Sequence, residues 1–158
     1  MSQLHVNLGP RSYDIAFGQG LLAGAAEFFE ARTKANHLLL ITDDNVEERY
    51  AIPLADACTE HGFEADVLVV APGEQTKCAD IAAQLWQTMI DEGCDRQSAV
   101  VAVGGGVVGD LAGFVAATFA RGLNFFQVPT TLLAQVDSSV GGKVGINLIG
   151  AKNMVGAF

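Results

Sequence analysis

Continuous apolar runs alternate with amphipathic stretches along most of the chain. Four runs predict strands, at residues 37–42, 65–70, 99–103 and 124–128, and residues 37–42 are apolar enough to be buried on both faces of a parallel sheet. The stretches around them have helical spacing, at residues 20–31, 46–61, 78–92, 106–120 and 130–139. This alternation predicts an α/β fold with a doubly wound, mostly parallel Rossmann-like sheet.

The two ends of the chain follow a different pattern. Residues 4–8 and 13–17 are short β-like runs around Gly-Pro-Arg-Ser and predict an N-terminal β-hairpin. From Val140 the pattern becomes glycine-rich, and we expect irregular chain there. Residues 154–158 resemble the start of another strand, without a cap or a polar tail. We therefore expect residues 1–158 to be one domain, the N-terminal part of a longer protein.

Two polar segments are predicted to cap helices. Asp43, Asp44 and Asn45 precede the helix expected at residues 46–61. Thr76 precedes the helix expected at residues 78–92 and is a candidate cap for it.

The composition excludes several classes of protein. The chain has 9 basic and 18 acidic residues, and its net charge of −9 disfavours nonspecific binding to nucleic acid or to anionic membranes. Its three cysteines form no CxxC pair, which is typical of reduced thiols in a cytoplasmic protein. No secretory signal is visible. Residues 99–120 are apolar enough for a membrane span, but Asp110 at their centre favours a strand, a turn and a buried helix instead.

The most informative stretch is residues 98–121, where a strand, a glycine turn and a helix follow one another. Gly104–Gly109 fits GxGxxG and offers backbone N–H groups at the positive end of a helix to a phosphate. Close packing between helix and strand is the alternative explanation for the glycines, because Gly109, Gly113 and Ala117 form a stripe of small residues. Asp110 is the only ionisable side chain between Ser98 and Ala120, so it must be paired, fixed or facing a ligand.

Other polar clusters also follow predicted strands. Asp43 and Asp44 could contact a ribose, or could simply cap the next helix. In the PGEQTK segment at residues 72–77, Glu74 and Lys77 could face a ligand or form a solvated pair. The last cluster gathers hydroxyls, carboxylate, amides and lysines that suit a polyhydroxylated, phosphorylated molecule, or a solvated loop: Thr130, Thr131, Asp137, Ser138, Ser139, Lys143, Asn147, Lys152 and Asn153.

Metal ligation finds little support in the spacing of the residues. His5, His37 and His61 are far apart in the sequence and form no HxH or HxxxH pattern. We therefore predict no metal site in this chain.

Taken together, the motifs resemble the 3-dehydroquinate synthase family. The resemblance spans nearly the whole chain and is most specific at residues 72–77, 104–122 and 127–158. It implies a lyase of the shikimate pathway of aromatic amino acid biosynthesis. The substrate would be a phosphorylated sugar acid, 3-deoxy-D-arabino-heptulosonate 7-phosphate. A bound NAD would be reduced and reoxidised within each turnover, and 3-dehydroquinate and phosphate would be the products.

The resemblance also implies roles for individual residues. It implies that NAD is contacted by Asp43, Asp44, Asn45, Glu74, Gln75, Lys77, Gly105, Gly106, Val107, Val108, Gly109, Asp110, Thr130, Thr131, Lys143 and Lys152. It implies that Asp137, Lys143 and Asn153 act on the substrate. Arg121 would bind the substrate phosphate of the neighbouring subunit in a homodimer, a task that suits a bidentate guanidinium.

The family's catalytic divalent metal, zinc or cobalt, is held by one Glu and two His in a second, helical domain that this chain lacks. The resemblance therefore implies that the isolated chain folds without turning over substrate. Two other classes remain open at this point. One is an NAD- and metal-dependent polyol dehydrogenase of the glycerol dehydrogenase kind, which would produce NADH; the other is a nonenzymatic nucleotide-binding domain.

Overall fold

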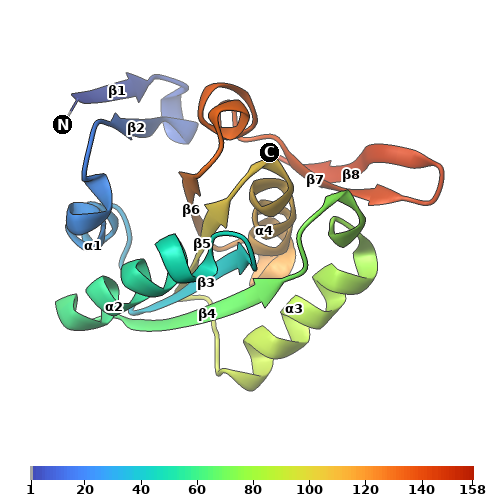
Figure 1. Cartoon of the computed structure of the whole chain (residues 1–158), viewed down its shortest axis with the longest axis horizontal. Coiled ribbons are helices and arrows are strands. Elements are labelled where there is room, and N and C mark those ends of the chain that lie inside the picture. The colour runs from blue at the N-terminus through green and yellow to red at the C-terminus, as the bar shows by residue number, and fades with distance from the viewer. Residues whose placement is uncertain (1) are drawn as a thin grey trace.

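A parallel sheet forms the centre of the computed structural model, which describes residues 2–158 (Figure 1). Its four strands lie in the order β4-β3-β5-β6. They span His37–Asp43 (β3), Glu64–Val70 (β4), Ser98–Gly104 (β5) and Asn124–Pro129 (β6). All neighbouring pairs are parallel, so the carboxyl ends of the four strands lie at the same edge of the sheet. The predicted strands and their parallel arrangement are confirmed.

Helices cover both faces of this sheet, as a doubly wound fold requires (Figure 1). One face packs against α1 (Ala25–Glu30) and α2 (Ile52–His61). The other packs against α3 (Ala79–Asp91) and α4 (Gly106–Thr118). Successive side chains of β3 and β5 alternate between the two apolar clusters, which explains why both strands are apolar at every position.

Two predicted helices are interrupted near their beginnings. The helix expected at residues 46–61 starts as a π-helical turn, η3 (Glu47–Ala51), before α2. Pro53 lies in the first turn of α2 and has no N–H to donate to the preceding turn, which accounts for the break. The helix expected at residues 20–31 begins as a 3₁₀ turn, η2 (Leu21–Gly24), and continues as α1.

The predicted caps are wrong in both places. The Thr76 hydroxyl donates a hydrogen bond to the Ala71 carbonyl at 2.6 Å. Helix α3 begins after Cys78, and within residues 2–158 no side chain caps its first turn. Asp43 accepts a hydrogen bond from the Asn45 N–H at 3.0 Å. This contact holds the turn after β3 in place and leaves the following helix uncapped within residues 2–158.

The N-terminal hairpin is confirmed. β1 (Ser2–Val6) pairs antiparallel with β2 (Tyr13–Phe17) across a 3₁₀ turn, η1 (Gly9–Arg11).

The expectation of irregular chain after Val140 is wrong. β7 (Val144–Leu148) and β8 (Ala151–Ala157) form a second antiparallel hairpin, drawn in red in Figure 1. Gly145 and Gly156 are cross-strand partners, and a Cβ on Gly145 would lie 2.8 Å from the Val155 carbonyl oxygen. The glycines that hide the strand pattern in the sequence are therefore required by the close pairing of the strands.

The apolar stretch at residues 99–120 is β5, a turn and α4, as predicted. Within residues 2–158, no helix combines the length and the hydropathy that a membrane crossing requires. The remaining turns are η4 (Glu74–Thr76), η5 (Phe119–Arg121) and η6 (Ala134–Ser138). η6 confirms the helical structure expected at residues 130–139, although it is a π-helical turn preceded by a short helical start at residues 132–133.

Candidate functional site

The glycine turn between β5 and α4 exposes the start of a helix at the carboxyl edge of the sheet. The first hydrogen bond of α4 runs from the Gly109 N–H to the Gly105 carbonyl at 3.0 Å. The preceding N–H groups, those of Gly106, Val107 and Val108, have no partner inside the helix. Within residues 2–158 no side chain caps this helix start. These N–H groups lie at the positive end of the helix dipole and can bind an anion.

The glycines of this turn serve two purposes, and the sequence left both open. A Cβ on Gly109 would lie 2.9 Å from the Gln127 side chain, and one on Gly113 would collide with Val144 and lie 2.9 Å from the Phe125 ring. These two glycines therefore let α4 pack closely on β6 and β7. A Cβ on Gly106 would lie 3.0 Å from the Ser138 hydroxyl oxygen. A Cβ on Gly105 would lie 3.3 Å from the Thr131 methyl group. Gly105, at the N-cap, and Gly106, the first residue of α4, therefore let Thr131 and Ser138 lie close to the start of the helix.

Thr130 and Thr131, which follow β6, differ in their hydrogen bonds. The Thr130 hydroxyl oxygen is buried and has no hydrogen-bond partner within residues 2–158, although its backbone N–H donates to the Gly104 carbonyl at 2.9 Å. The Thr131 hydroxyl accepts a hydrogen bond from the Ala134 N–H at 3.2 Å and so caps the following helical turn. A buried hydroxyl without a partner is costly, and it is the kind of group that a ligand satisfies.

Asp110 is paired with a buried lysine. Lys77 Nζ donates a hydrogen bond to Asp110 Oδ2 at 2.5 Å, and only 4% of the Lys77 side chain is exposed. The alternative that Lys77 forms a solvated pair with Glu74 is therefore wrong. Glu74 Oε1 lies 3.8 Å from the same ammonium group, so Lys77 is placed between two carboxylates.

Glu74 connects this pair to the hairpin β7–β8. Asn147 Nδ2 donates a hydrogen bond to Glu74 Oε1 at 2.8 Å, and Lys152 Nζ lies 4.0 Å from the same oxygen. The pKa of the Glu74 carboxyl is lowered, and the hydrogen bond from Asn147 is the largest cause. Partial burial acts in the opposite direction, and the charges of Lys77 and Lys152 lower the pKa further.

Asn147 holds the hairpin at two further points. Its backbone N–H donates to the Lys77 carbonyl at 2.8 Å, and its Oδ1 accepts from the Asn153 N–H at 2.9 Å. Asn153 has a left-handed φ of 56°, a conformation that costs free energy in a residue other than glycine and that often accompanies functional sites. The sequence places Asn147 in the polar cluster but gives it no role, because its bonds depend on a hairpin that the glycines conceal.

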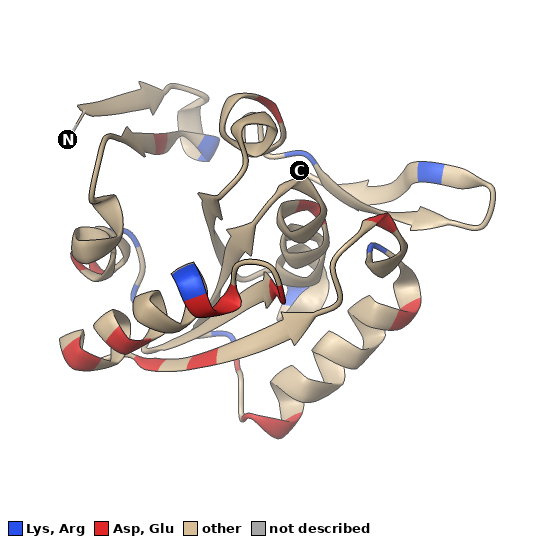
Figure 2. Cartoon of the chain, viewed as in Figure 1, with Lys and Arg blue, Asp and Glu red and all other residues tan. Residues whose placement is uncertain are grey.

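These contacts border an open hollow of about 710 Å³. Two segments line it: residues 74–80, which include Glu74, Gln75 and Lys77, and residues 147–152, which include Lys152. The C-terminal segment is basic: residues 138–158 contain Lys143 and Lys152 and no acidic residue. Figure 2 shows acidic residues on α2, α3 and β4, whereas the only charged residue on the hairpin is basic. In a chain of net charge −9, this segment suits an anionic ligand.

Other predicted site residues lie apart from this network. Asp43 ends β3, beside the end of β5, but its carboxylate bonds its own turn; Asp44 and Asn45 are exposed. Asp137 on η6 and Lys143 before β7 are exposed as well. Arg121 lies beyond the far end of α4 from Gly106, roughly 20 Å away at 1.5 Å per helical residue. Hydrogen bonds and ion pairs thus connect Glu74 with Lys77, Asp110 and Lys152, and Asn147 connects Asn153 to the same network. Within the described residues of one chain, Arg121 lies outside this network.

Comparison with known proteins decides the family. The model of the 3-dehydroquinate synthase N-terminal family matches residues 67–158, more than half of the chain. The chain belongs to the 3-dehydroquinate synthase family. The 3-dehydroquinate synthase of Desulforamulus reducens is 46% identical over 158 residues, which are 100% of this chain and 44% of that protein. The chain therefore spans less than half the length of such relatives.

Solved structures of sugar phosphate cyclases have the same fold. A 2-deoxy-scyllo-inosose synthase complexed with carbaglucose-6-phosphate, NAD+ and Co2+ matches with a TM-score of 0.91 and 30% identity, over 99% of this chain and 42% of that one. The 2-epi-5-epi-valiolone synthase ValA from Streptomyces hygroscopicus, with NAD+ and Zn2+ bound, matches with a TM-score of 0.81 and 29% identity, over 97% and 42%. An iron-containing alcohol dehydrogenase from Thermococcus thioreducens, at 18% identity and a TM-score of 0.54, shares the fold alone.

Proposed function

We propose that this chain is the NAD-binding N-terminal part of a 3-dehydroquinate synthase. The whole enzyme would convert 3-deoxy-D-arabino-heptulosonate 7-phosphate to 3-dehydroquinate and phosphate. The observation that carries the proposal is the start of α4 at the carboxyl edge of the sheet, which no side chain caps within residues 2–158. Family membership supports the reaction, and the uncapped helix start supports a cofactor site beside it.

The residues around the glycine turn fit a dinucleotide. A pyrophosphate would satisfy the N–H groups of Gly106, Val107 and Val108, which have no partner inside the helix, and the buried Thr130 hydroxyl has no hydrogen-bond partner within residues 2–158. The full proposed set comprises Asp43, Asp44, Asn45, Glu74, Gln75, Lys77, Gly105, Gly106, Val107, Val108, Gly109, Asp110, Thr130, Thr131, Lys143 and Lys152. When bound, NAD supplies a hydride acceptor that later returns the hydride to the same carbon of the substrate.

The chain's own side chains would position the substrate and hold charge. Lys77 keeps a buried positive charge between Asp110 and Glu74, at the edge of the hollow. We propose that Lys143 and Lys152 attract the phosphorylated sugar acid and that Asp137, Lys143 and Asn153 contact its reacting part. Oxidation of the substrate by NAD would make the elimination of phosphate easier. The main contribution of these residues would then be to hold the substrate in one orientation.

A titration with NAD tests the cofactor site directly. We expect saturable NAD binding to the 158-residue chain by calorimetry. Gly106→Ala should weaken it at least tenfold, because the new Cβ would lie 3.0 Å from the Ser138 hydroxyl oxygen and narrow the phosphate space. Gly24→Ala is the matched control, since its Cβ meets no atom closer than 3.8 Å. Absence of saturable binding to the unsubstituted, folded chain would contradict the proposal.

We further propose that the whole enzyme is a cytoplasmic homodimer in which Arg121 binds the substrate phosphate of the neighbouring subunit. The distance of Arg121 from the glycine turn supports a site shared between two subunits. The three free cysteines support a reducing, cytoplasmic location. Mixing full-length Arg121→Ala and Lys143→Ala subunits should restore about a quarter of the unsubstituted rate, because half the dimers are mixed and each has one intact site. No recovery on mixing would exclude the shared site.

The catalytic metal belongs, in this proposal, to the part of the enzyme beyond these residues. The 158-residue chain alone should therefore release no phosphate from the heptulosonate phosphate, even with NAD and zinc present. Release of phosphate by the purified chain would show that the reaction needs nothing outside it.

A further inference from the structure

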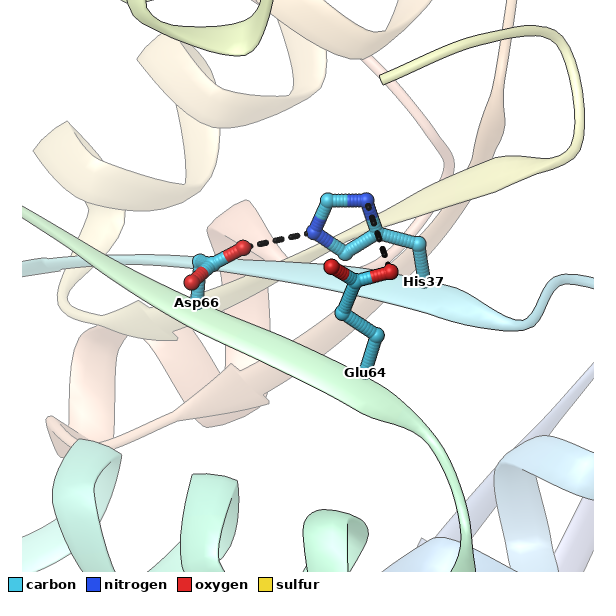
Figure 3. Close-up of side chains that lie close together, drawn as sticks. All are labelled: His37, Glu64 and Asp66. Carbon is cyan, nitrogen blue, oxygen red and sulfur yellow. Dashed lines mark hydrogen bonds and ion pairs between the residues drawn. The ribbon is translucent and has the colours of Figure 1, made fainter. Parts of the chain in front are cut away.

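Three potential metal ligands meet at the amino end of the sheet, on strands β3 and β4. His37 and Glu64 are direct cross-strand partners, and Asp66 lies two residues after Glu64, on the same face of β4. One ligand atom from each residue lies within 4.8 Å of the other two. Figure 3 shows the imidazole ring of His37 with a carboxylate close to each of its nitrogen atoms.

The histidine is held firmly, and the carboxylates open toward solvent. Only 6% of the His37 side chain is exposed, and its Nε2 lies in hydrogen-bonding distance of Asp66 Oδ2 at 2.7 Å. Its Nδ1 lies 4.0 Å from Glu64 Oε2 and 3.9 Å from the Cys94 sulfur. The side chains of Glu64 and Asp66 are 69% and 37% exposed, so an ion can reach the group from solution.

We propose that His37, Glu64 and Asp66 bind a divalent transition metal, with zinc the best match. One imidazole nitrogen and two carboxylate oxygens are ligands that zinc accepts, whereas calcium and magnesium prefer oxygen ligands alone. Tetrahedral bonds of about 2.0–2.2 Å place neighbouring ligand atoms about 3.3–3.6 Å apart. His37 Nε2 and Asp66 Oδ2 are 2.7 Å apart, so a bound ion would replace their hydrogen bond and separate them by about 0.6–0.9 Å. The exposed Glu64 carboxylate lies near the other ring nitrogen, Nδ1, and would turn toward Nε2 to complete the set.

The site would fasten the two strands together at the end opposite the glycine turn. β3 and β4 begin at His37 and Glu64, whereas Gly104 ends β5 at the other edge of the sheet. Zinc binding should therefore raise the stability of the folded chain without competing with NAD. The spacing of the histidines in the sequence does not reveal this group, since 27 positions separate His37 from Glu64 and the strand register alone joins them.

Zinc titration of the chain, after treatment with a chelator, tests the site. We expect one equivalent of Zn2+ to bind, and a saturating excess to raise the melting temperature by about 5 °C. Glu64→Gln and Asp66→Asn should each lower the zinc affinity at least tenfold, because each removes one charged ligand. Both side chains are partly exposed, so the variants should fold, which circular dichroism can check.

Glu30→Gln is the matched control. Glu30 accepts a hydrogen bond from His61 at 3.0 Å in a pair that has a single carboxylate, so its loss should leave the zinc affinity unchanged. The proposal is overturned if the folded chain binds no zinc saturably, or if the double variant of Glu64 and Asp66 binds it as tightly as the unsubstituted chain. Neither outcome depends on NAD binding or on the synthase activity.

Discussion

Lys77 Nζ and Asp110 Oδ2 are 2.5 Å apart, and this single contact joins the turn after β4 to the first turns of α4. The pair also receives Glu74, whose carboxylate is bonded to the hairpin through Asn147. Three segments that are distant in the sequence therefore depend on one buried ammonium group. A buried charge that loses its partner is strongly destabilising, so this contact has a testable energetic consequence.

Replacing Lys77 by methionine should destabilise the chain by about 3 kcal/mol, because it leaves Asp110 without its buried partner. Urea unfolding followed by circular dichroism measures this change. Lys152→Met is the control, because the Lys152 side chain is 76% exposed and its 4.0 Å contact with Glu74 should contribute about 0–1 kcal/mol. If the two variants lose similar amounts of unfolding free energy, the burial of the Lys77–Asp110 pair does not contribute the expected stability.

Acid should weaken the attachment of the hairpin through Glu74. The hydrogen bond from Asn147 lowers the pKa of the Glu74 carboxyl below the ordinary value of 4.5. A carboxyl whose pKa is lower in the folded state adds stability above its unfolded pKa, and this stability is lost as the pH falls through the folded pKa. NMR titration of the Glu74 carboxyl should therefore give a midpoint below 4.5. Asn147→Ala should move that midpoint upward, and an unchanged midpoint would contradict the assigned cause.

Thr130→Val should separate stability from ligand affinity. The Thr130 hydroxyl is buried without a partner within residues 2–158, so replacing it with a methyl group should leave the free energy of unfolding unchanged or slightly higher. NAD affinity should fall about threefold to tenfold if the cofactor satisfies that hydroxyl. Thr131→Val, which removes a helix cap, should instead cost about 1 kcal/mol of stability. A stability loss at Thr130 equal to that at Thr131 would argue against a ligand-facing hydroxyl.

Arg121 has a left-handed φ of 73°, which is unfavourable for any residue other than glycine. Arg121→Gly should relieve about 1 kcal/mol of strain, which the greater freedom of glycine in the unfolded chain largely offsets. We therefore expect the stability of the chain to change little, while turnover by the full-length enzyme falls at least tenfold. A fall in turnover accompanied by a large fall in the free energy of unfolding would indicate a structural role for Arg121 rather than a role at the substrate phosphate.

The parallel sheet could be predicted from the sequence because β3 and β5, buried on both faces, leave short continuous apolar runs, and stretches of helical spacing alternate with them. The hairpin β7–β8 could not, because Gly145 and Gly156 remove side chains from the very positions where the strands pair most closely. Helix caps failed for a related reason: the hydroxyl of Thr76 has a nearer acceptor in the Ala71 carbonyl, which only the folded turn provides.

The candidate site was predictable as a set of residues but not as a network. GxGxxG after a strand indicates an anion site from local structure alone. The partner of Asp110 depends on which residue of another loop reaches α4, and no local pattern encodes that choice. The meeting of His37 with Glu64 and Asp66 likewise follows from the register of two parallel strands, which the hydrophobic pattern leaves free to slide by two residues.

The N-terminal hairpin β1–β2 contributes no residue to either apolar cluster of the described chain. Polar contacts attach it to the rest of the chain: Arg32 donates a hydrogen bond to Asp14 at 2.8 Å, and the Gly141 N–H donates to the Tyr13 hydroxyl at 2.9 Å. Because its detachment uncovers little apolar surface, this hairpin should open at low free energy, long before the sheet unfolds. Each opening would release Gly141 and, with it, the loop that carries Lys143. We therefore expect the rate at which β1 and β2 detach to determine how often Lys143 is free to move.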